Sequence, residues 1–476
     1  MDKQQLKTQN SGERARKPLA QIKRNPWLRI WKLLNIFAIT GAFAACWYLF
    51  YADDMMVPFF ARGNWVVIVL FMVFYLLFAR IYAAFSVSLM RIRELAYSQS
   101  LAIGLSNVLI YIVISLISHG FVAVLPLLVT MFVQMLIAII WSFLAHSLYY
   151  RRFKPADTVV IWDSRQGLEE KIKEYNLYLR FNVTKSVYIA DCMQDIGATL
   201  QGAKVVFLYG IRSGERNDIV KYCVKNGVKA YVIPCVGDLL MKSAIPVNMM
   251  HLPVYMLQRH SPGPEYRLIK RAFDLIASAI ALLILSPLML VVALLVRRDG
   301  GPAFYKQTRL TKDGKTFKLI KFRSMRTDAE KDGVARLSTG ENDDRITPVG
   351  RWIRRFRVDE LPQFLNVLRG DLSIVGPRPE RPEIAEKYEE EIPEFALRLQ
   401  VKAGITGYAQ VYGKYNTTAY DKLLLDLHYI SKASVYQDLQ IMLATVKILF
   451  EPESTEGVEV GQTTAIGESE HEKVGV

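Results

Sequence analysis

The chain has 476 residues, of which 51% are hydrophobic, and 60 lysine and arginine residues outnumber 45 aspartate and glutamate residues to give a formal net charge of +15. The high apolar content argues against a purely soluble protein and indicates a membrane protein with two or three domains. The basic residues cluster beside apolar runs, and this pattern favours an anionic membrane surface over a nucleic acid as their partner.

Four apolar segments in the first third of the chain are each long enough to span a bilayer as a helix. They cover residues 33–52, 65–90, 101–118 and 121–150. Nine lysine and arginine residues lie between Lys3 and Lys32, so the positive-inside rule places the N-terminus in the cytoplasm. This leader is too polar for a cleavable signal peptide. Arg80, inside the second segment, is either functional or snorkels to the cytoplasmic face. We predict a four-helix transmembrane bundle at residues 1–150, after which the chain begins in the cytoplasm.

Short β-rich runs alternate with charged amphipathic segments between residues 155 and 258, which is typical of a parallel sheet with crossover helices. The runs are "TVVIWD", "SVYIAD", "KVVFLYG" and "KAYVIPC". A dinucleotide site would require G-x-G-x-x-G after the first strand, whereas the turn here reads "DSRQGLEE". We therefore predict a Rossmann-like α/β domain without a cofactor. The four cysteines lack CxxC spacing and a nearby histidine pair, so they indicate neither a zinc site nor a disulfide framework.

An uncharged run at residues 275–296 is long enough to cross a bilayer, but Pro287 at its centre removes the helical hydrogen bond to the carbonyl of Leu283. Basic residues flank both ends of the run, so the positive-inside rule places both ends on the cytoplasmic side. We expect a re-entrant helix at 272–296 that bends at Ser286 and Pro287 and returns to the same face, with the Ser286 hydroxyl bonded to a freed carbonyl. The alternative is an ordinary proline-kinked span.

The adjacent pair Asp359 and Glu360 differs from other acidic pairs in its surroundings. Arginines precede and follow it, and Pro362 suits the first turn of a helix, so both carboxylates would lie at the positive end of a helix dipole. A carboxylate among so many positive charges is expected to stay ionised, and it can then attack phosphorus or hold Mg²⁺. The alternative is a solvated acidic pair that balances a basic helix.

Several basic residues are candidate phosphate ligands. In "GDLSIVGPRPE", Pro377 and the glycine before it fix a tight turn that would present Arg378 on a stiff backbone. A guanidinium fork suits bidentate phosphate binding. Lys321 and Arg323 in "KFRSM" are further candidates. For any one of these side chains the alternative is contact with the membrane surface.

The segment from about Tyr266 to Phe450 resembles the bacterial sugar transferase domain of the monotopic phosphoglycosyl transferases. Six motifs occur in the family's order: "KRAFD", "SP", "KFRSM", "DELPQ", "GPRPE" and "GITGYAQVYG". With the four spans and the α/β insert, the chain is similar to the large members of that superfamily over nearly its whole length. The resemblance implies a mostly α-helical monotopic catalytic domain at 262–450 with a re-entrant helix. The acidic tail at 451–476 is expected to be weakly ordered.

The resemblance also implies a function and a location. It implies a bacterial inner-membrane enzyme, with its catalytic domain on the cytoplasmic face, that uses Mg²⁺ to transfer galactose 1-phosphate from UDP-galactose to undecaprenyl phosphate. This reaction would begin O-antigen or related polysaccharide assembly. By the same resemblance, Asp359 is the nucleophile, Glu360 is its partner at the metal, and Arg354 and Arg378 bind phosphate. The other implied partners are membrane lipids and a second copy of the chain in a homodimer, with no role for nucleic acid.

The chain departs from the family pattern at two places, and several rival functions stay open. The family usually has Ser or Thr where this chain has Arg357, and often "RPGITG" where it reads "KAGITG", which leaves the hydrogen bonds around Asp359 open. The transferred sugar could be glucose or an N-acetylated hexose. A non-catalytic membrane assembly factor or chain-length regulator would not account for "DELPQ" or "GPRPE". An NAD-dependent nucleotide-sugar enzyme lacks its glycines, and a DxD-type glycosyltransferase would depend on Asp343 and Asp344.

Overall fold

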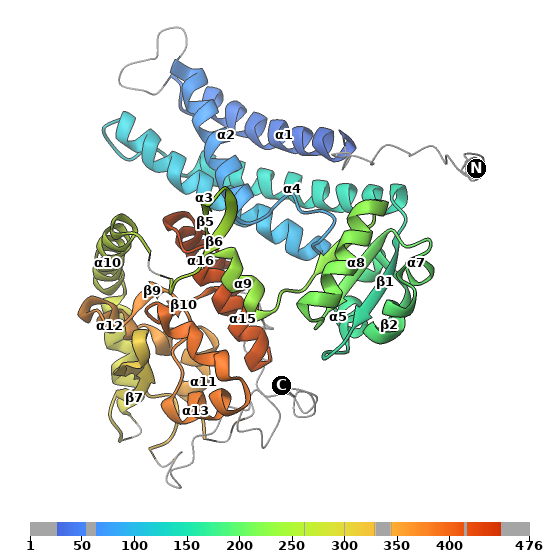
Figure 1. The fold of residues 1–476 in the computed structure, drawn as a ribbon. Coiled ribbons are helices and arrows are strands. Elements are labelled where there is room, and N and C mark those ends of the chain that lie inside the picture. Colours follow the sequence, from blue (N-terminus) through green and yellow to red (C-terminus); the bar gives the residue numbers. More distant parts are fainter. Residues whose placement is uncertain are drawn as a thin grey trace, which may run out of the picture. The chain divides into compact units, whose positions relative to one another are not determined.

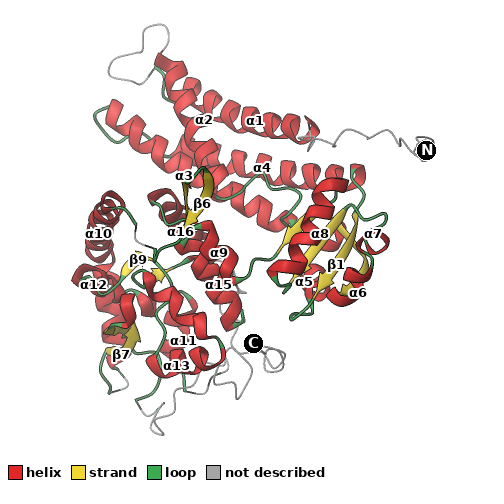
Figure 2. Ribbon diagram, viewed as in Figure 1, coloured by secondary structure: helices red, strands yellow, loops and turns green. Residues whose placement is uncertain are grey.

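The computed structural model describes residues 26–53, 63–260, 262–298, 300–327, 329, 343, 345–413 and 417–448. Figures 1 and 2 show its helices and strands. Contacts within the chain separate two compact units, which comprise residues 1–76 with 85–233 and residues 77–84 with 234–476. The basic leader before residue 26 and the acidic tail at 451–476 lie outside the described residues.

Four long apolar helices open the chain, as the sequence predicts. They are α1 (Pro26–Phe50), α2 (Gly63–Ile81), α3 (Ile92–Ile117) and α4 (Leu125–Arg152), and each is long and apolar enough to cross a bilayer. The second helix ends at Ile81 rather than at residue 90, so Arg80 lies in its last turn with an exposed side chain. This position favours snorkelling over a charge in mid-membrane. The arrangement of the four as one bundle stays a prediction.

Buried polar side chains link the helices of the first unit. Asn35 of α1 donates a hydrogen bond to Gln99 Oε1 at 3.1 Å and accepts one from the Tyr75 hydroxyl at 2.6 Å. Asn107 of α3 donates to Gln134 Oε1 of α4 at 2.8 Å. Because lipid offers no hydrogen-bond partners, such groups hold neighbouring membrane helices in register.

The α/β part of the first unit contains four parallel strands in the order β2-β1-β3-β4. The strands are β1 (Ala156–Trp162), β2 (Phe181–Tyr188), β3 (Val205–Tyr209) and β4 (Lys229–Val232). The helices are α5 (Leu168–Glu174), η1 (Leu177–Leu179), α6 (Ile189–Gln194), α7 (Ile196–Thr199) and α8 (Ser213–Asn226). Ile161 and Val206 on the sheet pack with Ile219 and Cys223 of α8 in a buried core. The predicted parallel α/β architecture is therefore confirmed, while its lack of a cofactor stays a prediction.

The boundary between the two compact units lies earlier than the predicted domain end at residue 258. Residues from 234 onward group with the second unit. Helix α9 (Val236–Lys242) buries Val236 and Leu239 in the core of that unit. The antiparallel hairpin of β5 (Ile245–Met249) and β6 (Leu252–Met256) follows it.

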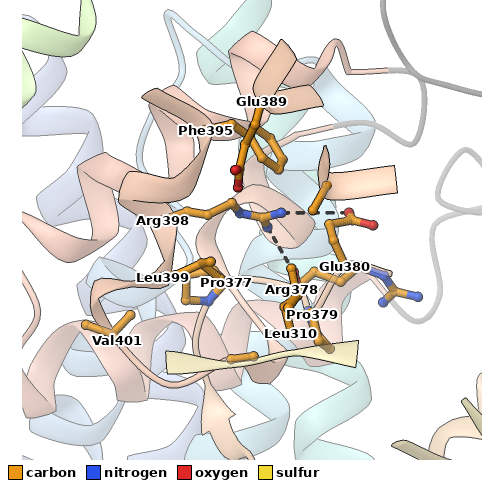
Figure 3. Close-up of a pocket in the computed structure, with 12 residues that line it drawn as sticks. Leu310, Pro377, Arg378, Pro379, Glu380, Glu389, Phe395, Arg398, Leu399 and Val401 are labelled. Atoms are coloured by element: carbon orange, nitrogen blue, oxygen red, sulfur yellow. Dashed lines mark hydrogen bonds and ion pairs between the residues drawn. The ribbon is translucent and has the colours of Figure 1, made fainter. Parts of the chain in front are cut away.

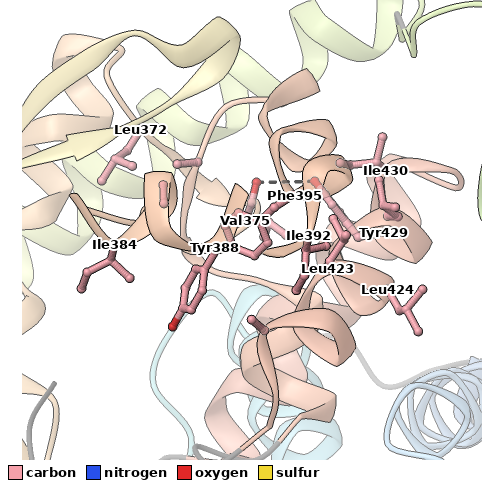
Figure 4. Packing of buried hydrophobic residues seen from close by; sticks show 14 of the residues in the cluster. Leu372, Val375, Ile384, Tyr388, Ile392, Phe395, Leu423, Leu424, Tyr429 and Ile430 are labelled. Carbon is pink, nitrogen blue, oxygen red and sulfur yellow. Dashed lines mark hydrogen bonds between the residues drawn. The ribbon is translucent and has the colours of Figure 1, made fainter. Parts of the chain in front are cut away.

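The second unit is mostly helical and has one large apolar core, part of which is shown in Figure 4. Its first elements after the β5–β6 hairpin are α10 (Pro264–Arg297), β7 (Phe304–Leu310), η2 (Lys312–Gly314), β8 (Thr316–Phe322), α11 (Pro348–Arg355), η4 (Val358–Glu360) and α12 (Gln363–Arg369). Those that follow are β9 (Ser373–Val375), α13 (Pro382–Glu391), η5 (Pro393–Gln400), β10 (Gly404–Thr406), α14 (Tyr408–Tyr412), α15 (Ala419–Ile430) and α16 (Val435–Ile448). Tyr429 joins the core to the sheet by donating its hydroxyl to the Val375 carbonyl at 3.4 Å.

Helix α10 carries the apolar run that the sequence predicts to be re-entrant. Its helical conformation continues through Pro287, so the proline does not end the helix. The Ser286 hydroxyl donates to the Leu283 carbonyl at 2.8 Å, which confirms the predicted compensation for the missing amide hydrogen. The return of this segment to the same face of the membrane stays a prediction.

Both halves of α10 are fastened to the second unit. In the first half, Asp274 accepts a hydrogen bond from the Ile374 amide at 3.0 Å, and Arg271 donates to two carbonyls of α12 at 2.7 and 2.9 Å. In the second half, Val292 and Val296 are buried in an apolar cluster with side chains of β8, α11 and η4. The most apolar stretch of the helix is only 11% buried, so its outer surface is available to lipid.

Candidate functional site

A short turn between α11 and α12 presents the predicted acidic pair. Arg357 begins the turn with a φ of 53°, a left-handed conformation that costs a non-glycine residue on the order of 1 kcal/mol. Val358, the next residue, is buried in the same apolar cluster as Val292 and Val296 of α10. The turn that carries the two carboxylates is therefore anchored directly on the second half of the apolar helix.

Glu360 is held by cations from three segments of the chain. Lys321 Nζ of β8 and an Arg378 amino group each donate to its Oε1, at 3.1 and 3.0 Å, and Arg357 lies 4.0 Å from its other oxygen. Burial by itself would raise the pKa of Glu360, but the charges of Lys321, Arg378 and Arg357 outweigh it and hold this pKa well below its usual range. Glu360 is therefore ionised, and its carboxylate holds the neighbouring cationic side chains close together.

Asp359 has a different environment, although it is the adjacent residue. Burial and the negative charge of Glu360 raise the pKa of Asp359 to about 6, against the opposing charges of Lys321, Arg354 and Arg378. Among the described residues, no group donates a hydrogen bond to its carboxylate. Both carboxylates are therefore ionised at neutral pH, as expected, but the pKa of Asp359 lies much closer to neutrality than that of Glu360, because burial and the charge of Glu360 raise it.

The loop that carries Arg378 packs tightly against the neighbouring backbone. Gly376 donates its amide hydrogen to the Thr406 carbonyl at 2.8 Å, and the Gly404 amide donates to the Pro377 carbonyl at 2.9 Å. A side chain on Gly376 would collide with the Lys402 carbonyl, and one on Gly404 would collide with the Gly376 amide. Glycine is required at both positions because the backbones approach so closely.

The structure brings together only part of the predicted phosphate-binding set. Lys321 and Arg378 meet at Glu360, with Pro377 beside them in the chain, and Arg354 acts on Asp359 through its charge. Arg323 lies elsewhere, because its buried guanidinium donates to the carbonyls of residues 296 and 302, both at 2.9 Å. These bonds secure the end of α10 and give Arg323 a structural role. Ser286 and Pro287 lie within α10, as predicted.

The structure does not support Asp343 as part of the metal-binding pair of a DxD-type glycosyltransferase. Asp343 is buried, and its two oxygens accept hydrogen bonds from the Arg345 guanidinium at 2.8 and 2.7 Å. Asp344 lies outside the described residues. Because Arg345 occupies both oxygens of Asp343, neither oxygen is available to a divalent ion.

Sequence reasoning missed a buried charged cluster behind Arg378, part of which is drawn in Figure 3. Arg398 of η5 donates to Asp426 Oδ2 of α15 at 2.9 Å, and it lies 3.8 Å from Glu380. Arg309 of β7 lies 3.7 Å from the same glutamate. Burial raises the pKa of Asp426, against the effect of Arg398. These residues are far apart in sequence, and the only sequence signal was the short spacing from Arg378 to Glu380 in "GPRPE".

The acidic pair can be tested for its fit to the predicted Mg²⁺. Among the described residues, no group of three or more His, Cys, Asp or Glu side chains gathers to hold a metal. However, Mg²⁺ is often bound through one or two carboxylates and the phosphates of a substrate rather than by a full protein cage. The unpaired Asp359 oxygens and the second oxygen of Glu360 suit that mode of binding.

The site combines an available carboxylate with a concentrated positive charge. Asp359 can be ionised near neutral pH and has no hydrogen bond to break before it reacts. Lys321, Arg354 and Arg378 surround it with cations that suit phosphate oxygens. This arrangement fits nucleophilic attack on a phosphorus atom, since the cations can stabilise the charge that develops.

Comparisons with known proteins match the same part of the chain. A family model described as bacterial sugar transferase matches residues 265–452. A UDP-N-acetylgalactosamine-undecaprenyl-phosphate N-acetylgalactosaminephosphotransferase of Aeromonas hydrophila is 36% identical over 260 residues, 54% of this chain and 60% of that protein. An undecaprenyl-phosphate galactose phosphotransferase of Salmonella typhimurium is 39% identical over 207 residues, 40% of this chain and 43% of that protein.

A third relative is matched almost completely. The exopolysaccharide production protein PSS of Rhizobium leguminosarum is 45% identical over 188 residues, which are 37% of this chain and 93% of that protein. By contrast, the chain spans about half the length of the Aeromonas and Salmonella proteins. The segment that the family model matches contains all but the first residue of α10, the acidic pair and the Arg378 loop.

Proposed function

Because this chain belongs to the bacterial sugar transferase family, we propose that it transfers a sugar 1-phosphate from a UDP-sugar to undecaprenyl phosphate and releases UMP. The observation that carries the proposal is the unpaired Asp359 carboxylate beside the cations gathered by Glu360. We propose galactose as the sugar and an early step of O-antigen or related polysaccharide assembly as the role. The names of two relatives, which specify galactose and N-acetylgalactosamine, make the sugar the first quantity to measure.

The reaction we propose has two displacement steps. An Asp359 oxygen attacks the β-phosphorus of the UDP-sugar, the bond from that phosphorus to the bridging oxygen breaks, and UMP leaves with the electron pair. A sugar phosphate is then attached to Asp359 through a phosphorus–oxygen bond. An oxygen of undecaprenyl phosphate attacks the same phosphorus and displaces the Asp359 carboxylate. The product is undecaprenyl-diphosphate-sugar.

The cations around Asp359 and Glu360 have different roles in stabilising negative charge. Arg378, whose side chain is 41% exposed, and Arg354 bind the phosphate oxygens of the donor and the lipid. Glu360 holds both Arg378 and Lys321 in place, and the charge of Lys321 adds to the positive charge that the diphosphate meets. Asp359 and Glu360 would hold Mg²⁺ with the substrate phosphates. When bound there, the ion supplies further positive charge against the repulsion between carboxylate and diphosphate.

The same geometry supports a catalytic domain that stays on one face of the membrane. Asp274 and Val296, near opposite ends of the apolar run, are both bound to the second unit, and the exposed side chains between them are apolar except for Ser286. We propose that α10 is a re-entrant helix in the bacterial inner membrane and that the second unit lies at its cytoplasmic face. The acidic pair, anchored on α10, would then meet the lipid phosphate at the level of the headgroups. The homodimer is likewise a proposal.

The test is UMP release from a panel of UDP-sugars. Purified protein would be incubated with Mg²⁺, undecaprenyl phosphate and, in turn, UDP-galactose, UDP-glucose, UDP-N-acetylglucosamine or UDP-N-acetylgalactosamine. We expect turnover with UDP-galactose and a sugar-phosphate adduct on Asp359 when the lipid is omitted. Asp359→Asn should abolish both, because the amide is not a nucleophile.

The matched control is Asp313→Asn, which alters an exposed aspartate of the same unit that pairs with Arg259 at 2.6 Å. It should keep wild-type turnover. Substantial transfer by Asp359→Asn, or kinetics that require both substrates to bind before UMP leaves, would replace the covalent route with direct attack by the lipid phosphate. Turnover with another sugar alone would correct the specificity and leave the reaction class intact.

A further inference from the structure

In the loop at 376–380, the four consecutive carbonyls of residues 377–380 each accept a hydrogen bond. The Gly404 amide donates to the Pro377 carbonyl, and the Leu310 amide donates to the Glu380 carbonyl, each at 2.9 Å. The two carbonyls between them accept from side chains instead. Arg309 donates to the carbonyl of Pro379 at 3.1 Å.

The other side-chain donor acts on Arg378 itself. Arg398 donates to the Arg378 carbonyl at 2.9 Å, and its guanidinium is fixed from two more directions. Asp426 Oδ2 accepts from it at 2.9 and 2.7 Å, and the Phe395 ring lies 4.9 Å below it. With only 4% of its side chain exposed, Arg398 cannot contact a substrate directly.

A small pocket lies between the loop and the side chains of Phe395, Leu399 and Val401, and Figure 3 shows Arg398 reaching across to the loop. The hydrogen bond from Arg398 to the Arg378 carbonyl therefore spans a gap in the packing on this face of the loop. The Arg378 side chain is 41% exposed, and both its bond to Glu360 and the position of its backbone help to set the direction of its guanidinium.

We propose that Arg398, held by Asp426, is a positioning residue that aims Arg378 at the reacting phosphate. This inference rests on the proposed function, because it assigns Arg378 to phosphate binding. Arg398 acts only through Arg378 and through the shape of the loop at 376–380. A small displacement of a phosphate ligand can cost a large part of the rate, because the reacting groups must be aligned.

The first test is a double-mutant cycle on UMP release. The variant Arg398→Met/Asp426→Leu removes both buried charges together, which avoids leaving one of them unpaired and often preserves stability. We expect kcat to fall about 10- to 100-fold in an otherwise wild-type chain. In a chain that already carries Arg378→Ala, the same double substitution should cost less than about threefold, because there is no guanidinium left to aim. Equal losses in both backgrounds would overturn the proposal, as would full activity of the Met/Leu variant.

The second test does not depend on activity. Hydrogen–deuterium exchange of peptides covering 374–381 should be at least about tenfold faster in Arg398→Met/Asp426→Leu than in the wild type, because the loop opens more often. Arg271→Met is the control, since Arg271 also binds two backbone carbonyls but at α12, and it should leave this loop unchanged. Unchanged exchange in the Met/Leu variant overturns the positioning role.

A milder variant covers the case in which the double variant fails to fold. Arg398→Lys keeps a positive charge beside Asp426, but its single ammonium group is less able to bind both the carboxylate and the Arg378 carbonyl. We expect faster exchange in the loop with a preserved melting temperature, and the opposite result counts against the proposal. If the wild type transfers no sugar phosphate, the proposed function fails while the exchange experiments still decide whether Arg398 fixes the loop.

Discussion

At the scale of single residues, neighbouring carboxylates have opposite roles because one of them takes the direct contacts with the cations. Glu360 accepts hydrogen bonds from Lys321 and Arg378, and its pKa falls. Burial and the resulting negative charge beside Asp359 raise the pKa of Asp359 to about 6. Pairs of acids whose environments separate their pKa values are a common basis for assigning different chemical roles.

The pH dependence of the first half-reaction follows from this difference. Asp359 must be ionised to attack, so the rate of adduct formation should fall below about pH 6, with the loss of one ionisation, and level off above it. The measurement is the single-turnover rate of UMP release between pH 5 and pH 8 without lipid. A rate that stays constant down to pH 5 would contradict the raised pKa of Asp359 in the reacting enzyme.

Glu360→Gln should change both the rate and its pH dependence. The substitution removes the charge that raises the pKa of Asp359, so the acidic limb of the profile should move to lower pH. It also removes the ionised acceptor of Lys321 and Arg378, so kcat should fall about 100-fold as these cations lose their fixed positions. The pH–rate profile of the remaining activity measures both effects. An acidic limb that stays at pH 6 would show that Glu360 does not act on Asp359 electrostatically.

At the scale of secondary structure, local patterns in the sequence were sufficient for the main elements of the first unit and for the apolar helix of the second. The four parallel strands and the four N-terminal helices follow from hydrophobic periodicity, and the hydroxyl bond of Ser286 follows from the chemistry of Pro287. The grouping of α9 with the second unit could not be predicted. It depends on the burial of Val236 and Leu239 against residues more than a hundred positions later in the chain, which no local pattern records.

The membrane topology of α10 can be tested by labelling single cysteines. In a variant without its four native cysteines, Arg267→Cys and Arg298→Cys would place a thiol at exposed positions before and after the apolar run. If α10 returns to the cytoplasmic face, an impermeant thiol reagent added to intact cells, with their outer membrane permeabilised, should label neither position.

The positive control for that experiment is His119→Cys, in the exposed turn between α3 and α4 that the sequence predicts to face outward. It should react in intact cells. Both α10 positions should react only after the inner membrane is broken. Labelling of Arg298→Cys from outside would show that α10 crosses the bilayer as a proline-kinked span.

At the scale of the whole molecule, the site was predicted as far as its residues lie in contiguous motifs. Asp359, Glu360, Lys321 and Arg378 belong to such motifs and come together in the structure. Arg398 and Asp426 were not predicted, because their importance arises only when η5 and α15 fold against the Arg378 loop. Arg323 is the converse case. Its position in a motif made it a candidate phosphate ligand, but in the structure its guanidinium donates to backbone carbonyls.

The compact unit is larger than the segment that defines the family. The family model begins at residue 265, and the Rhizobium protein, of which this chain matches 93%, consists of little more than this segment. In this chain, however, α9 also contributes to the core, with Val236 at 8% and Leu239 at 3% exposure. Removing α9 would therefore open part of the core although it leaves every catalytic residue in place.

Two truncated proteins should separate catalysis from stability. A fragment of residues 234–476 keeps the compact unit from α9 onward and should retain UMP release, whereas a fragment of 262–476 lacks α9 and should be less stable by about 3–6 kcal/mol. This figure assumes that each of the two buried side chains contributes about 1.5–3 kcal/mol. The measurements are UMP release and thermal unfolding in the same detergent.

The control is the longer fragment with Leu239→Ala, which should lie between the two fragments in stability, because it leaves only part of the cavity. If the 262–476 fragment melts at the same temperature as the 234–476 fragment, α9 does not belong to the catalytic core. If neither fragment turns over while the full chain does, residues before 234 are needed for activity. Those residues include 77–84, which belong to the second unit and whose Tyr82 hydroxyl donates to the Leu443 carbonyl at 3.1 Å, so restoring this segment would be the next comparison.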